Sequence, residues 1–325
     1  MMLSRVADNL YWMSRYLERA QHTARLLDVT LDLLPERSPD AAAKAWEKLF
    51  ASLGIQVEMD EPARPFSYMQ RLSFDTNESG SIASTIAAAR ENARQVREEI
   101  SSEMWEQVNR LYLNVTAANA QTVWAQPHAF FQEVKQGTHL FQGITDSTMN
   151  RGQGWQFIQV GQFIERAGNI STLLDVYLRG LGLEALELSR EAHQDAVCLL
   201  RSCTAWEAYC KVYTANTKFS WIAEFLLLNE EFPHSVHFSV MMVRDALFFI
   251  ADAAESHKNS NVIRAVGRLK AMLDYGHIDE IISNNLYVVL RDIQMECRQI
   301  HTLLYQNYIH YPVDEKLPAS SMARY

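Results

Sequence analysis

The chain has 325 residues, which is enough for one large domain or two small ones with a substantial buried core. With 48% hydrophobic residues but only 12 Gly and 8 Pro, its composition is typical of a helix-rich globular protein and excludes a disordered or all-β chain. The net charge of −9 argues against binding to nucleic acid or to an anionic membrane, because both partners require a basic protein face.

The N-terminal segment predicts one long helix. Apolar side chains recur there in alternating steps of three and four residues, the spacing of one helix face, until Pro35 ends the pattern. A second helix with the same apolar stripe runs from about Phe157 to the glycines Gly180 and Gly182. The two share a repeat: residues 15–29 read RYLERAQHTARLLDV and residues 162–176 read QFIERAGNISTLLDV.

The remaining elements are also helical. From the apolar periodicity we expect helices over 40–53, 80–122 with a break near Ser101, 128–142, 189–229, 235–256, 260–274 and 278–310. Prolines or glycines gather in Gln56–Ser81 and in 136–155, so both segments are predicted to be loops. The segment 312–325 is polar and reads as a poorly ordered tail.

These elements predict an all-α fold. We expect residues 1–311 to form one large helical bundle built from two pseudo-repeated halves, about 1–145 and about 150–311. Each half contributes a long central helix that carries a Glu-Arg pair. The halves should share one core, because a long helix cannot bury several apolar faces without partners.

The cysteines indicate a reducing environment. They form no CxxC pair, and the first three fall within one predicted helix, as small core residues do. The N-terminus lacks the basic region and cleavage site of a signal peptide, and no run of about 18 apolar residues occurs. We therefore expect a cytoplasmic protein that neither is secreted nor spans a membrane. The four cysteines are Cys198, Cys203, Cys210 and Cys297.

The repeated Glu-Arg pairs are Glu18–Arg19 and Glu165–Arg166. Arg19 interrupts a second apolar row on its helix, so we expect it in the interior, where its charge requires a partner. Adjacent side chains on a helix point about 100° apart and cannot fully satisfy one another. Partners must come from the other helix or from positions three, four or seven residues away. Those neighbours are Arg15, His22 and Arg25 in the first copy, and Gln162 and Asn169, both uncharged, in the second.

Two interpretations of the pairs stay open. In the first, Glu18 binds Arg166 and Arg19 binds Glu165, and these buried ion pairs hold two antiparallel helices in register. Such pairs add little net stability, but removing one partner costs about 3–5 kcal/mol. In the second, Arg15, Arg19 and Arg166 line a pocket for a carboxylate or phosphate, which the planar guanidinium suits.

A third charged segment, ARENARQVREEIS at 89–101, supplies further candidates. Arg90, Asn92 and Arg94 are candidate ligand-binding residues in it. The alternative is a solvated helix face stabilised by pairs of opposite charge one turn apart.

Sequence motifs for other chemistry are scarce. Only EFPH, Glu231–His234, has the Glu-x-x-His spacing of di-iron bundle proteins, and its proline argues against a continuous helix there. No nucleotide-binding, hydrolase or zinc-protease motif occurs. We expect no metal and no other cofactor.

Four stretches together carry a resemblance to a known family. They are SRVADNLYWMSRYLERAQHTARLLDV at 4–29, ARENARQVREEISSEMWEQVNRLYL at 89–113, GQGWQFIQVGQFIERAGNISTLLDV at 152–176 and WEAYCKVYTANTKFSWIAEFLLLNEEFPHSVHFSV at 206–240. In order and spacing they resemble the bacterial alpha-E family, which is all-helical and named for its Glu-Arg motif. The resemblance spans residues 1–310.

The resemblance implies both residues and partners. It implies that the family motif falls on the two Glu-Arg pairs and that 90–94 is a second recurrent stretch. Where relatives often read Pro-Arg-Ser, this chain has Pro233, His234 and Ser235. Members of the family are typically encoded beside an ATP-grasp peptide ligase and a transglutaminase-like peptidase, which implies a system that makes or modifies peptides.

Three functions follow as alternatives. The chain is an accessory component of such a system that binds a small anionic or peptide ligand or a partner protein, without nucleic acid or membrane. Alternatively, it is an enzyme that acts on an amino acid or peptide, with Glu18 or Glu165 as general base; neighbouring arginines would lower the pKa of either carboxylate. The third alternative is a purely structural helical scaffold.

Overall fold

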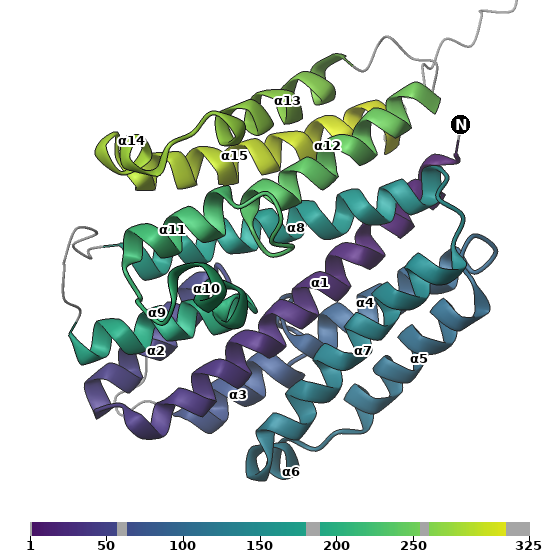
Figure 1. Ribbon diagram of the computed structural model, residues 1–325. Coiled ribbons are helices and arrows are strands. Elements are labelled where there is room, and N and C mark those ends of the chain that lie inside the picture. Colours follow the sequence, from purple (N-terminus) through teal and green to yellow (C-terminus); the bar gives the residue numbers. More distant parts are fainter. Residues whose placement is uncertain (1, 57–63, 180–188, 254–259, 310–325) are drawn as a thin grey trace, which may run out of the picture.

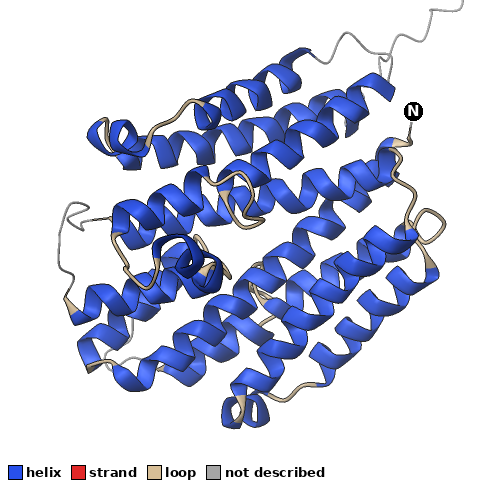
Figure 2. Cartoon of the chain, viewed as in Figure 1, coloured by secondary structure: helices blue, strands red, loops and turns tan. Residues whose placement is uncertain are grey.

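The fold is known from a computed structural model, which describes residues 2–56, 64–179, 189–253 and 260–309. These ranges contain fifteen α-helices and no β-strand (Figure 2), so the predicted all-α class is confirmed. The predicted tail, 312–325, lies outside them. The helices are α1 (Ser4–Leu33), α2 (Pro39–Ser52), α3 (Pro65–Phe74), α4 (Ile82–Gln95), α5 (Ser102–Ala117), α6 (Ala120–Ala125), α7 (Pro127–Thr148), α8 (Gln153–Leu178), α9 (Arg190–Ser202), α10 (Trp206–Tyr213), α11 (Phe219–Leu228), α12 (Val236–Ala253), α13 (Ser260–Asp274), α14 (Ile278–Ser283) and α15 (Leu286–Leu304).

The two longest helices, α1 and α8, cross at the centre of the molecule (Figure 1). They run in the same direction: the backbone N–H of Met2 donates to Gln153 at the start of α8, and Glu18 meets Arg166 halfway along both helices. The expected antiparallel arrangement is therefore wrong. Reciprocal Glu-Arg pairs can form between parallel helices as well as between antiparallel ones. The pairing therefore did not determine the relative direction of α1 and α8.

The helices around this crossing follow the same order of contacts in each half. α1 packs against α4 and α7, while α5 packs against both of those helices. α8 packs in the same way against α12 and α15, and α13 packs against both. Figure 1 shows the first set on one side of the central pair and the second set on the other. The Glu-Arg pairs thus lie between two layers of helices.

α4 and α12 begin in the same way. Ser81 and Ser235 each accept a hydrogen bond on their hydroxyl from the backbone N–H three residues later, at 3.1 and 2.9 Å. Such N-caps satisfy a donor that the first helical turn leaves unpaired. The carbonyl of each serine also accepts a side-chain hydroxyl four residues on. The equivalence places Gly80 in the position that His234 takes in the second half.

Two predicted loops are wrong. α3 occupies part of 56–81, and α7 and α8 leave only four residues between them within 136–155. Two glycines of the second segment, Gly137 and Gly154, lie inside helices at close contacts with neighbouring residues. A Cβ at Gly137 would lie 2.8 Å from Leu111 of α5, so glycine permits close helix contact there rather than a turn.

Two long predicted helices are broken where the sequence gives no warning. Thr204 and Thr214 have φ of 53° and 57° and divide 189–229, and Asn285, with φ of 79°, divides 278–310. Residues other than glycine rarely adopt this conformation, so periodicity alone extended the helices across these points. Cys198 and Cys210 consequently lie on different helices, which corrects their assignment to one. The break expected near Ser101 is confirmed, since Ser101 caps α5.

None of the helices in the described ranges has the length and hydrophobicity that a membrane crossing requires.

Candidate functional site

Glu18 and Arg166 form a closed ion pair. The Nε and Nη2 atoms of Arg166 donate to the two carboxylate oxygens of Glu18 at 2.7 and 2.8 Å. The Nη1 atom donates to the carbonyl of Pro233 at 3.1 Å. Both side chains are at most 6% exposed and every guanidinium nitrogen is bonded, so this buried pair has no nitrogen left to bind a ligand.

Glu165 has two arginine partners. The Nε atom of Arg15 donates to one carboxylate oxygen and the Nε atom of Arg19 to the other, each at 2.7 Å. Burial raises the pKa of Glu165, but the two arginines outweigh burial and hold the pKa at about 2. Glu165 is therefore ionised at neutral pH and is a weak base.

Arg19 differs from its equivalent, Arg166. It binds Glu165 through Nε alone, and its side chain is 29% exposed. The Nη1 and Nη2 atoms make no hydrogen bond to any residue of the described ranges. The expectation of an interior location thus holds for Arg166 and only partly for Arg19. The site combines one closed pair with one guanidinium whose terminal nitrogens are unused.

The unused nitrogens belong to a residue that lines a cavity of about 400 Å³, which we call the Arg19 cavity. Two of its lining residues carry a buried nitrogen without a hydrogen-bond partner: Nε2 of His22 and Nδ2 of Asn169. Burial lowers the pKa of His22 to about 4, so the imidazole is neutral at neutral pH. Besides Arg19, the lining includes His22, Arg71, Ser79, Gly80 and Asn169.

The two halves also differ in the residue before the N-cap serine, which is Gly80 in the first half and His234 in the second. In the second half, the carbonyl of Pro233 caps Arg166, and His234 lies close enough to Arg166 for its charge to lower the imidazole pKa, together with burial. In the first half the equivalent residues, Ser79 and Gly80, line the cavity. A Cβ on Gly80 would have only Ile55 within 4.0 Å, so the space beside it is open.

Comparison of the sequence with known proteins shows which family the chain belongs to. A sequence model described as a predicted alpha-helical domain with a conserved ER motif, named Alpha-E, matches residues 2–309. The chain belongs to the Alpha-E family. Uncharacterized proteins from Mycobacterium bovis and Mycobacterium tuberculosis match 85% of this chain, with 24% sequence identity. The match covers only 33% of the length of these relatives, so the chain spans about a third of each. No solved structure matches.

Within this Alpha-E chain, the segment 90–94 does not join the Glu-Arg pairs. Arg90 donates to Asn109 of α5 at 2.7 Å and lies over the ring of Tyr112. Arg94 forms an exposed pair with Glu91, and Asn92 is half-buried. None of the three contacts a residue of the Glu-Arg motif by a hydrogen bond or an ion pair in the described ranges.

Several polar residues of the site had no sequence signal. Tyr11 and His301 bond to one another beside Arg15, although they are 290 residues apart. Only the fold brings α15 to α1, so spacing along the chain could not connect them. Gly80 did have a signal, because it and His234 each precede a serine that starts an apolar helix pattern.

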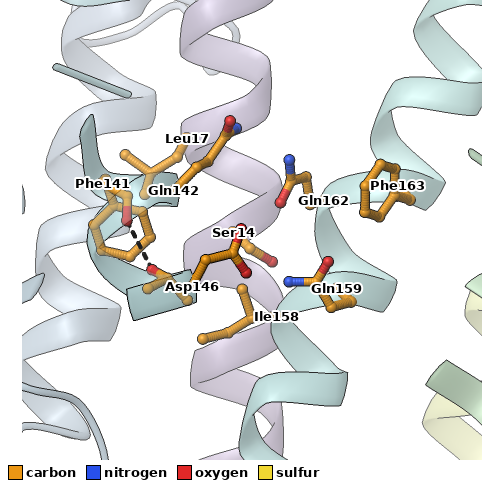
Figure 3. A pocket seen from close by; sticks show the side chains of 10 residues that line it. Ser14, Leu17, Phe141, Gln142, Asp146, Ile158, Gln159, Gln162 and Phe163 are labelled. Carbon is orange, nitrogen blue, oxygen red and sulfur yellow. Dashed lines mark hydrogen bonds between the residues drawn. The ribbon is translucent and has the colours of Figure 1, made fainter. Parts of the chain in front are cut away.

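A smaller cavity of about 90 Å³ lies where α1, α7 and α8 meet (Figure 3). The close-up shows Gln142, Gln159 and Gln162 around it together with Ser14 and Asp146. It contains no arginine of the Glu-Arg motif, so we do not assign the motif's chemistry to it.

Metal and thiol chemistry find little support. Within the described ranges, no three His, Cys, Asp or Glu side chains are grouped as metal ligands. His237 instead pairs with Asp274 at 2.7 Å. Burial raises the pKa of the thiols of Cys198, Cys203 and Cys297, which makes them poor nucleophiles.

Proposed function

We propose that this chain is a non-catalytic binding component of a bacterial ATP-grasp-associated system that forms or modifies peptides. In this proposal the Arg19 cavity holds the carboxylate or phosphate group of a ligand. The observation that carries the proposal is the difference between Arg19 and Arg166, equivalent residues of which only Arg19 has unbonded terminal nitrogens beside a cavity.

The charges around the cavity favour an anion. Two other charged residues line the cavity, Arg71 and Glu78, and they pair with one another at 2.8 Å. Glu165 supplies one negative charge to both Arg15 and Arg19, so one positive charge of this cluster stays uncompensated. The wall at Ser79 and Gly80 leads directly into the N-terminus of α4, where the helix dipole is positive. A carboxylate or phosphate would accept hydrogen bonds from the planar fork of Arg19.

A binding role fits the site better than the two alternatives. A general base that works near neutral pH needs a pKa close to 7, and Glu165 has a pKa of about 2. A purely structural role accounts for the Glu18–Arg166 pair. It gives no reason for a partly exposed arginine beside buried nitrogen atoms without a partner, which are costly unless a ligand or water satisfies them.

Closing the Arg19 cavity should abolish ligand binding without unfolding the protein. We expect Gly80→His, which copies the second half, and Arg19→Met each to weaken binding of phosphate or acetate at least tenfold. Isothermal titration calorimetry of the two ions at constant ionic strength measures this. Gly143→His and Arg110→Met are matched controls at exposed positions. Unchanged affinity in Gly80→His and Arg19→Met would overturn the assignment, as would a wild-type chain that binds neither ion at millimolar concentration.

The partner part of the proposal rests on the family resemblance. It is supported by relatives in which the matched region is a third of a longer chain. A tagged chain should co-purify from its own host with an ATP-grasp ligase and a transglutaminase-like peptidase, and its deletion should reduce the ligase's product. The absence of both effects would count against a role in such a system.

A further inference from the structure

A second cavity, which we call the His301 cavity, opens between α1, α8 and α15. It has a volume of about 190 Å³, room for several water molecules or a small ligand. It shares Glu165 and Asn169 with the Arg19 cavity, whereas its other polar residues are Arg15, Thr172 and several residues of α15. Its lining includes Arg15, Glu165, Asn169, Gln294, Arg298 and His301.

The hydrogen bonds beside the cavity fix the proton on His301. The Nη1 atom of Arg15 donates to the hydroxyl of Tyr11 at 3.0 Å, and this hydroxyl lies 2.7 Å from Nδ1 of His301. The same Nη1 atom lies 3.3 Å from Nδ1 of His301. A guanidinium can only donate, so Nδ1 is an acceptor, and the hydroxyl of Tyr11 directs its own proton at it. Burial raises the pKa of Tyr11 to about 12, and the hydroxyl therefore keeps that proton.

The imidazole consequently presents a donor on its other side. Burial and the charge of Arg15 lower the pKa of His301 to about 4, so the ring is neutral and carries one proton. Because Nδ1 accepts from Tyr11, this proton lies on Nε2. His301 is a lining residue of the cavity, and this N–H makes no hydrogen bond with the described residues.

Three further lining residues have donors that the protein does not use. The Nδ2 atom of Asn169 and the Nε2 atom of Gln294 are buried and have no hydrogen-bond partner. The guanidinium of Arg298 is exposed and makes no hydrogen bond or ion pair with the described residues. The lining carboxylate, Glu165, already has both oxygens bonded by Arg15 and Arg19.

We propose that the His301 cavity is a second binding site, specific for an oxyanion: a carboxylate or a phosphate group. Such a group has several acceptor oxygens and a negative charge, which match the unused donors of Asn169, Gln294, His301 and Arg298. An ammonium ligand finds no free carboxylate in this lining, because Arg15 and Arg19 bind both oxygens of Glu165. The site does not depend on the unbonded nitrogens of Arg19.

The imidazole of His301 provides a local readout. Nitrogen-15 spectra of the histidine side chains should show His301 protonated on Nε2 at pH 7. Titration with phosphate or with acetate at constant ionic strength should move its resonances in a saturable way. A response to one ion alone identifies the group that the site prefers. A ring protonated on Nδ1, or a response that chloride reproduces, would overturn the proposal.

Variants test the binding residues. Arg298→Gln and Gln294→Leu should each lower the affinity reported by His301 at least tenfold, whereas Arg291→Gln, an equally exposed position on α15, should leave it unchanged. Gly80→His fills the Arg19 cavity but leaves Glu165 and its two arginines untouched, so it should leave the His301 response intact. Failure of the Arg19 cavity and failure of this site are therefore distinguishable. Equal affinities in wild type, Arg298→Gln and Gln294→Leu would refute the site.

Discussion

Arg166→Met should lower the free energy of unfolding by about 3–5 kcal/mol, because it leaves the carboxylate of Glu18 buried without its partner. Glu18 is at most 4% exposed, and Arg166 supplies two hydrogen bonds to it. Arg19→Met should cost less than Arg166→Met, because it leaves no buried charge without a partner. Its side chain is 29% exposed, and Glu165 would keep Arg15.

Urea unfolding of the two single variants measures this difference. The double variant Glu18→Leu, Arg166→Met removes both buried charges and should be more stable than Arg166→Met alone, since an apolar pair carries no desolvation cost. Equal losses in Arg19→Met and Arg166→Met would contradict the distinction between a closed and an open pair. Loss of ligand binding in Arg19→Met with little loss of stability would support it.

The distinction also shows where prediction from sequence ended. The repeat of the Glu-Arg motif predicted two central helices. The first of the two interpretations also predicted reciprocal ion pairs between them, because a buried charge on one helix requires an opposite charge on its neighbour. Both pairs are present. Each of the two interpretations, the buried ion pairs and the anion pocket, treated Arg19 and Arg166 alike. Arg166 fits the first of them, and Arg19 has the features that the second requires.

The difference arises outside the repeated motif. Gly80 and Ser79 lie some 60 residues from Arg19 in sequence, and the cavity depends on which residues precede the helix that packs beside the motif. Three of the four donors of the His301 cavity, those of Gln294, Arg298 and His301, come from α15, at the other end of the chain. Periodicity identifies which face of a helix is buried, but it does not say which distant side chain reaches that face.

Gly161→Ala should have the other large effect, a loss of about 3 kcal/mol or more in the free energy of unfolding. Gly161 lies at the crossing of α1 and α8. A Cβ there would overlap the carbonyl oxygen of Tyr11 and the hydroxyl of Ser14. Ser14 is a side chain and can move, but the Tyr11 carbonyl is part of the α1 backbone, so the two helices would have to separate.

Gly168→Ala is the matched control on the same helix. A Cβ at Gly168 has no atom within 4 Å, so this variant should keep its stability or gain up to about 1 kcal/mol from the better helix propensity of alanine. Thermal unfolding of both variants makes the comparison, and a Gly161→Ala chain as stable as wild type would show that the crossing tolerates a wider spacing. Separation of α1 from α8 would also lengthen the contacts of Glu18 with Arg166 and of Glu165 with Arg19. If Gly161→Ala folds at all, it should therefore lose stability and phosphate affinity together, whereas Gly80→His should lose affinity alone, because it fills a cavity without moving either central helix.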